Sequence, residues 1–147
     1  MQLIPIKQHP EENEEFINNP ACRETIHQTI DFYKKVGFVP PWIGYYAEED
    51  GTLVAAAGFK GPPVNGTIEI AYGTFEEYQQ QGFGTKVCKQ LVDLSLTTDP
   101  SIQITARTLP EENPSTRILR KNNFELMGTV NDPEDGDVWE WLFKHPE

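Results

Sequence analysis

The segment from Glu69 to Leu94, EIAYGTFEEYQQQGFGTKVCKQLVDL, contains the residues best suited to bind a charged ligand. Three glutamines precede Gly82 and Gly84, and an apolar stripe with helical spacing follows them. Backbone N–H groups at a helix N-terminus have no intrahelical partners, and the helix dipole favours negative charge there. Glycines also let a backbone approach its ligand closely. The stretch therefore indicates either a sharply turned helix entry or a backbone cradle for a phosphate group.

Two common phosphate-binding loops do not match this segment. The dinucleotide fingerprint GxGxxG requires a third glycine, and Val87 stands in its place. The nucleotide P-loop requires GxxxxGK followed by Ser or Thr, but Thr85 separates Gly84 from Lys86. The pattern that does match is Gln/Arg-x-x-Gly-x-Gly/Ala over residues 79–84, between a predicted strand and a predicted helix.

The N-terminal part of the chain predicts an edge strand, a core-facing helix and a hairpin. QLIPI near the start predicts a short strand at a sheet edge, because proline cannot donate to a ladder. A helix is expected to begin at Pro20, with Asn19 as its cap and Gly37 at its end. The segment WIGYYAEEDGTLVAAAGFKG predicts two strands joined by a tight turn at Asp50 and Gly51.

The rest of the chain predicts strands that alternate with helices. TIEIAYGT alternates like a half-buried strand, a helix follows from Gly84 to Ser95, and SIQITAR predicts a short strand. Asn113 and Pro114 open a further helix, which Asn123 can close in a left-handed conformation. FELMGTV and DVWEWLFK predict two final strands. This order predicts a mixed α/β fold, α+β in type, with helices packed on one sheet.

Composition narrows the cellular setting and the class of partner. A chain of 147 residues is long enough for one domain, expected to span residues 1–147. A net charge of −11 opposes binding to nucleic acid or anionic membranes and suits a cationic or amine-bearing partner. The cysteines and histidines lack ligand spacing, so no metal and no disulfide framework are expected. No signal-peptide pattern or membrane-length apolar run occurs, which predicts a cytoplasmic protein.

Three sequence blocks, in order, resemble the GNAT superfamily of Gcn5-related N-acetyltransferases. GFKGPPVNGTIEIAY resembles the hairpin and fourth strand of many bacterial members, and QQQGFG resembles their CoA-binding loop. LPEENPSTRILRKNNFE resembles their segment with Asn, Ser and a Leu-x-Lys-x-Gly-Phe ending. The blocks cover most of residues 42–125. The resemblance implies the acyl-CoA N-acyltransferase fold, with a mixed, mostly antiparallel central sheet, and direct acetyl transfer from acetyl-CoA to a primary amine.

The resemblance also implies where CoA binds. In the family, the pyrophosphate lies on the loop backbone and the pantetheine arm runs beside the fourth strand. Asn113 matches an asparagine that contacts this arm, although a plain helix cap also explains it. Because the loop carries no cationic side chain, binding is expected to weaken only mildly with salt. The implied cofactor-binding residues are Tyr72, Gly73, Thr74, Gln79, Gln80, Gln81, Gly82, Phe83, Gly84, Thr85 and Asn113.

The chemistry of acetyl transfer suggests roles for a few further groups. A lysine-type amine has a pKa of about 10.4, so a base or a water chain must remove its proton. The resemblance places Glu69 where a carboxylate often does this, and a solvent-facing structural role fits equally well. A backbone N–H of Tyr72 or Thr74 can stabilise the oxyanion. Leu119 replaces a tyrosine that protonates the leaving thiolate in many relatives; Ser115 can substitute for it or merely bond the helix entry.

Two classes of function fit these observations. The first is an N-acetyltransferase whose acceptor is the amine of a small molecule or peptide, with no nucleic acid or membrane partner. A protein N-terminus, a polyamine, an amino acid or an aminoglycoside would each suit an acidic protein. The second is a non-catalytic acyl-CoA-binding sensor or scaffold of the same fold, suggested by the absent tyrosine. Dimers are frequent in the family, so a homodimer is compatible with either class.

Overall fold

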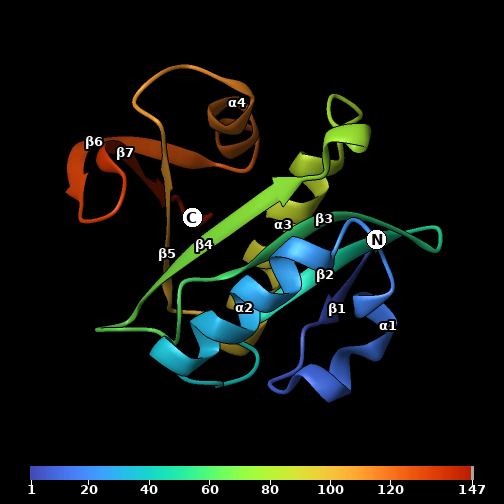
Figure 1. The fold of residues 1–147 in the computed structure, drawn as a ribbon. Helices are drawn as coiled ribbons and strands as arrows, with labels where there is room; N and C mark the ends of the chain where they lie inside the picture. The colour runs from blue at the N-terminus through green and yellow to red at the C-terminus, as the bar shows by residue number, and fades with distance from the viewer. Residues whose placement is uncertain (147) are drawn as a thin grey trace.

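A computed structural model describes residues 1–146, whose strands form one curled seven-stranded sheet (Figure 1). The strand order is β1-β2-β3-β4-β5-β7-β6. All neighbouring strands are antiparallel except β4 and β5, which are parallel. The strands are β1 (Gln2–Pro5), β2 (Gly44–Glu49), β3 (Thr52–Phe59), β4 (Thr67–Thr74), β5 (Gln103–Thr108), β6 (Phe124–Asp132) and β7 (Gly136–Phe143).

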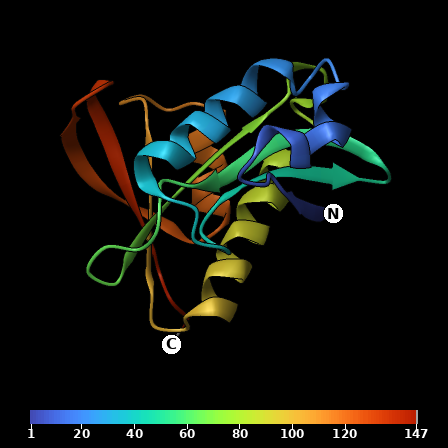
Figure 2. The same cartoon turned by 60° about the horizontal axis from the view of Figure 1, so that its bottom comes forward.

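Helices cover both faces of this sheet. The long helix α2 lies on one face and α3 on the other, so that the sheet passes between them (Figure 2). Helix α4 packs against α3 and β6. Within residues 1–146, no helix combines the length and the apolar character needed to cross a bilayer. The helices are α1 (Glu14–Ile17), α2 (Arg23–Val36), α3 (Phe83–Thr98) and α4 (Pro114–Lys121), with 3-10 turns η1 (Pro10–Asn13) and η2 (Glu76–Tyr78).

The turns around these elements follow the residue types that the sequence offers. Asp50 and Gly51 both adopt positive φ, 50° and 82°, as the predicted two-residue hairpin requires. Asn123, with φ of 65°, ends α4 in the predicted left-handed conformation. Gly37, with φ of 93°, ends α2 as predicted. Local turn chemistry was therefore a reliable guide to these three boundaries.

The predicted start of α2 is wrong. The helix begins at Arg23 and not at Pro20. The side-chain oxygen of Asn19 accepts a hydrogen bond from the N–H of Ala21, at 3.0 Å, which closes a local turn before the helix. Asparagine favours such turns because its side chain bonds backbone two residues further on, and this competes with helix capping.

Alternate side chains of β4 point to opposite faces of the sheet, and both faces contribute to the site. Ile68 and Ile70 are each 2% exposed and belong to the core, where α3 packs on β4. Successive side chains of a strand point to opposite faces. Glu69, Ala71 and Gly73 therefore lie on the other face, the one that α2 covers.

Candidate active site

Strands β4 and β5 pair over only part of their length. Residues 67–70 of β4 pair with residues 103–106 of β5, whereas β4 continues to pair with β3 as far as Thr74. The two strands diverge beyond this point (Figure 1). Within residues 1–146, β4 thus has no strand partner on its β5 side after Ile70. The second half of β4 offers backbone hydrogen-bonding groups to a ligand.

The hydrogen bonds to β3 show which groups these are. The C=O of Glu69 accepts from the N–H of Lys60, and the N–H of Phe75 donates to the C=O of Val54, each at 2.9 Å. Odd-numbered residues of β4 therefore direct their backbone groups to β3, and even-numbered residues direct theirs to the side of β5. The groups that face the divergence are those of Tyr72 and Thr74. The C=O of Thr74 already accepts from the side chain of Gln79, at 3.2 Å.

A cavity of about 570 Å³ opens at this divergence, between β4, the loop before α3, and α4. Its lining includes most residues implied by the family resemblance. Gln81 and Phe83 are not part of it: the Gln81 side chain donates to the C=O of Glu77, and the Phe83 ring packs edge-on against Tyr78. The implied residues that line the cavity are Tyr72, Gly73, Thr74, Gln79, Gln80, Gly82, Gly84, Thr85, Asn113 and Ser115.

The two glycines of the loop serve different purposes. Gly82 caps α3 in a left-handed conformation with φ of 84°, and a β-carbon there would meet no atom within 4 Å. Gly84 lies in the first turn of α3, and a β-carbon there would come within 2.6 Å of Ile118 Cδ1. The first glycine therefore shapes the loop and leaves space above it, and the second lets α4 pack closely on α3.

Cationic side chains reach the cavity from α4 and not from the loop. Lys86 and Lys89 of α3 form ion pairs of 2.8 and 2.9 Å with acidic side chains. Arg117 and Lys121 line the cavity, and neither forms an ion pair within residues 1–146. No sequence motif indicated this face of α4, although the spacing of its residues is a usable signal. The lining residues Pro114, Arg117, Ile118 and Lys121 follow the i, i+3, i+4, i+7 pattern of one helix face.

The hydrogen bonds at the start of α4 define the local surroundings of Asn113 and Ser115. The Asn113 side chain accepts from the N–H of Thr116, and the Thr116 hydroxyl accepts from the N–H of Asn113, both at 3.0 Å. Asn113 thus caps α4, and it also lines the cavity. Ser115 does not bond the helix entry, and its side chain makes no hydrogen bond within the described residues. Leu119 is 1% exposed and belongs to the core.

A second cavity, of about 410 Å³, lies on the opposite side of β4 beneath α2. Gln28, Thr29 and Phe32 of α2 line it, together with the second half of β4. Tyr72 and Gly73 line both cavities. A short piece of β4 backbone therefore separates two spaces that could hold two different molecules.

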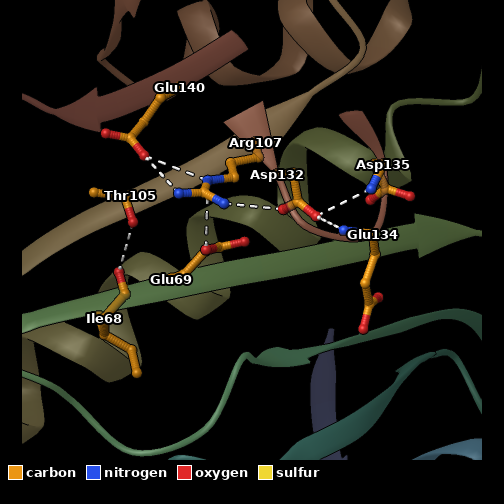
Figure 3. A network of polar contacts seen from close by, with 8 residues as sticks. All are labelled: Ile68, Glu69, Thr105, Arg107, Asp132, Glu134, Asp135 and Glu140. Atoms are coloured by element: carbon orange, nitrogen blue, oxygen red, sulfur yellow. Dashed lines mark hydrogen bonds and ion pairs between the residues drawn. The ribbon is translucent and has the colours of Figure 1, made fainter. Parts of the chain in front are cut away.

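Glu69 lies on the same face of β4 as the second cavity but lines neither cavity. Its side chain is 27% exposed, and its Oε1 atom lies 3.9 Å from Arg107 Nε. Arg107 donates hydrogen bonds to Asp132 at 2.9 Å and to Glu140 at 3.2 Å (Figure 3). The Arg107 guanidinium lies between the carboxylates of Glu69, Asp132 and Glu140, so this cluster of acidic side chains already contains a cation. Within residues 1–146, no cluster of His, Cys, Asp or Glu is arranged to hold a metal ion.

The surroundings of Glu69 raise the pKa of its carboxyl. Burial raises the pKa of the Glu69 carboxyl above its usual value, Arg107 and Lys60 oppose this rise, and Asp132 and Glu140 add to it. The Glu69 carboxylate accepts no hydrogen bond from any described residue, so its oxygen atoms are open to water or to a ligand. A raised pKa makes a carboxylate a stronger base.

The chain matches a family model described as an acetyltransferase (GNAT) domain over residues 2–125. It therefore belongs to the GNAT acetyltransferase family. The uncharacterized N-acetyltransferase p20 of Bacillus licheniformis is 30% identical over 88 residues, 59% of this chain and 49% of that protein. The uncharacterized N-acetyltransferase YjdG of Bacillus subtilis (strain 168) is 25% identical over 92 residues, 62% of this chain and 52% of that protein. The chain thus spans about half the length of these relatives.

Solved structures share the fold across nearly the whole chain. The structure of AAC(6')-Ib in complex with ribostamycin and coenzyme A has a TM-score of 0.70 at 20% identity, covering 97% of this chain and 92% of that one. A variant of spermidine N-acetyltransferase SpeG from Vibrio cholerae has a TM-score of 0.70 at 15% identity, covering 97% and 94%. These likenesses confirm the predicted mixed α/β fold with a sheet flanked by helices.

Proposed function

We propose that this chain is an N-acetyltransferase that uses acetyl-CoA and acetylates a primary amine of a small molecule or peptide by direct transfer. One observation carries the proposal: the interrupted pairing of β4 and β5 coincides with a cavity at the N-terminus of α3. A strand edge suits the amides of a pantetheine arm, and a helix N-terminus suits a phosphate. CoA is a ligand that carries both groups.

The phosphate end of CoA would lie on the start of α3. The N–H groups of Phe83, Gly84 and Thr85 belong to the first turn, where helices leave their donors without intrahelical partners. Arg117 and Lys121 supply positive charge from the other wall of the cavity. The pantetheine amides would pair with the backbone groups of Tyr72. The phosphates would thus lie beside hydrogen-bond donors and cations, and the pantetheine amides beside free backbone groups of a strand.

The acetyl group would react beside Tyr72, where the two cavities meet. The amine enters from the α2 side, bonds to the carbonyl carbon, and displaces the CoA sulfur as a thiolate. The Tyr72 N–H donates to the carbonyl oxygen as that oxygen gains charge. Glu69 takes the amine proton through water, because two residues of strand, about 7 Å, separate it from Ala71 in the cavity wall. A water molecule returns a proton to the thiolate, directly or through the Ser115 hydroxyl, which regains its own proton from that water. The thiolate is a weak base, because its conjugate thiol has a pKa of about 8.5.

The proposal also includes the class of amine acceptor and the cellular location of the protein. AAC(6')-Ib is an aminoglycoside acetyltransferase and SpeG acetylates spermidine, so polyamines and amino sugars are natural first candidates here. The net charge of −11 attracts cations of this kind. Cys22 and Cys88 are buried free thiols, which suits the reducing cytoplasm.

A thiol-release assay tests the activity directly. The purified chain is incubated with acetyl-CoA and separate amines: spermidine, kanamycin, an amino acid and a peptide with a free N-terminus. We expect at least one amine to raise thiol release well above the rate without amine, with a product heavier by one acetyl group. Tight CoA binding in calorimetry without any amine-dependent release would instead support the non-catalytic sensor.

A further inference from the structure

Arg107 stands between β4 and the β6–β7 hairpin and faces three carboxylates (Figure 3). Its NH1 group donates to Asp132 at 2.9 Å, and its NH2 and Nε groups donate to Glu140 at 3.2 and 3.3 Å. Its Nε lies 3.9 Å from Glu69, beyond hydrogen-bond distance. The guanidinium therefore gives all these hydrogen bonds to the hairpin and only its charge to Glu69.

Asp132 is a firm anchor for this arrangement. Its second carboxylate oxygen accepts from the N–H groups of Glu134 and Asp135, at 2.8 and 3.1 Å. These backbone bonds, together with the bond from Arg107, hold the pKa of Asp132 below its usual value. The carboxylate that orients Arg107 is thus fixed by the turn of the hairpin and not by a mobile side-chain contact.

A direct hydrogen bond from Arg107 would stabilise the charged form of Glu69 and weaken it as a base. Without Arg107, the negative charges of Asp132 and Glu140 would raise the pKa of Glu69 further and favour its uncharged form. The observed distance avoids both extremes. We propose that Arg107 is a positioning residue for Glu69. The β6–β7 hairpin holds the Arg107 guanidinium close enough to act on Glu69 through its charge but too far away to donate a hydrogen bond to it. This inference rests on the proposed function, in which Glu69 accepts the amine proton.

Four charged groups from four parts of the fold act on Glu69: Lys60 after β3, Arg107 on β5, Asp132 on β6 and Glu140 on β7. Arg107→Gln removes the nearest cation and leaves two anions, so the pKa of Glu69 should rise. Glu140→Gln removes one anion and releases two donor groups of Arg107, so the pKa of Glu69 should fall. Opposite shifts from two substitutions in one network are what a merely structural role would not produce.

The test is a carbon-detected NMR titration of the Glu69 carboxyl in the parent, Arg107→Gln and Glu140→Gln proteins, with Glu69→Gln to assign the signal. We expect the Glu69 midpoint to move by about one pH unit upward in the first variant and downward in the second. Glu125→Gln is the matched control, because Glu125 pairs with Lys144 on the same hairpin and does not touch Arg107. This control should leave the midpoint unchanged.

The catalytic consequence is read from kcat/KM against pH for each variant, divided by the parent value with the same amine. Division cancels the titration of the amine itself. The low-pH limb of this ratio should move in the same direction as the NMR midpoint. Equal midpoints in all proteins, or shifts of the same sign in both variants, would overturn the proposal. The proposal would also be overturned if the pKa shifts occurred as expected but the Glu69→Gln variant were as active as the parent.

The proposed function fails separately, if the parent protein releases no thiol with any amine. The NMR titration reads the same electrostatic arrangement without turnover, so the two failures are distinguishable. Thermal unfolding of each variant shows whether it is folded during the titration. Should Arg107→Gln unfold, Glu140→Gln alone still decides the sign of the shift.

Discussion

Replacing Gly82 with valine separates the ligand-binding role of the loop from its structural role. The new β-carbon would meet no atom within 4 Å, so packing does not resist it. The cost arises from the left-handed backbone, with φ of 84°, and amounts to about 1–2 kcal/mol. Domains of this size are stable by about 5–15 kcal/mol. The variant should therefore fold, with a modestly lower melting temperature.

The same substitution should weaken CoA binding much more than it weakens the fold. The valine side chain would occupy the space through which a phosphate approaches the first turn of α3. Loss of one charge-assisted hydrogen bond costs about 1.5–3 kcal/mol, which corresponds to a roughly 10- to 150-fold higher Kd. Calorimetric titration with CoA measures this change directly.

Gly66→Val is the matched control for Gly82→Val. Gly66 also adopts positive φ, 75°, and also has no atom within 4 Å of a β-carbon, but it precedes the opposite end of β4. It should lose similar stability and keep its CoA affinity. If Gly82→Val binds CoA as tightly as the parent, or if both variants lose equal affinity, the cradle is not where we place it.

Three further predictions concern charge. Arg117→Gln with Lys121→Gln should weaken CoA binding and flatten its salt dependence, as titrations at several salt concentrations will show; a parent without salt dependence would contradict this. Glu69→Gln should lower turnover by about 100- to 10,000-fold at unchanged CoA affinity, with partial recovery at high pH, and equal rates would remove it from the mechanism. The pKa of Asp132 is lowered by bonds from Glu134, Asp135 and Arg107, so its ionised form stabilises the fold. That stabilisation is complete above its unfolded pKa and is lost as pH falls through the folded value, so Asp132→Asn should reduce the acid dependence of unfolding.

The loop and most secondary structure could be predicted because their signals are local. Asp50, Gly51 and Asn123 occupy the left-handed conformations that their residue types favour. The boundary near Asn19 failed for the same kind of reason, since its side chain can close a turn as readily as it can cap a helix. Local sequence rules allow both the turn and the helix cap at Asn19 but do not say which of the two forms.

The site depends on pairings that no local pattern contains. Alternation shows that Glu69 points away from Ile68 but not which helix covers that face. The meeting of Arg107 with Glu140 follows from the position of β7 between β5 and β6, which pairs residues 33 apart in the chain. The charge around the cavity has the same origin: the loop itself carries no cationic side chain, whereas folding brings Arg117 to the opposite wall of the cavity.

The incomplete pairing of β4 leaves an unpaired strand edge in the middle of the sheet, a feature that is usual only at its outermost strands. Within residues 1–146, the strand pairing between the β1–β4 half of the sheet and the β5–β7 half is confined to residues 67–70 of β4 and 103–106 of β5. An unpaired strand edge invites an extended chain to add to it. If the pantetheine arm occupies that edge, it serves as a temporary eighth strand, and the two halves of the sheet are held together partly by the ligand. The resistance of the sheet's centre to local opening then becomes a function of CoA concentration.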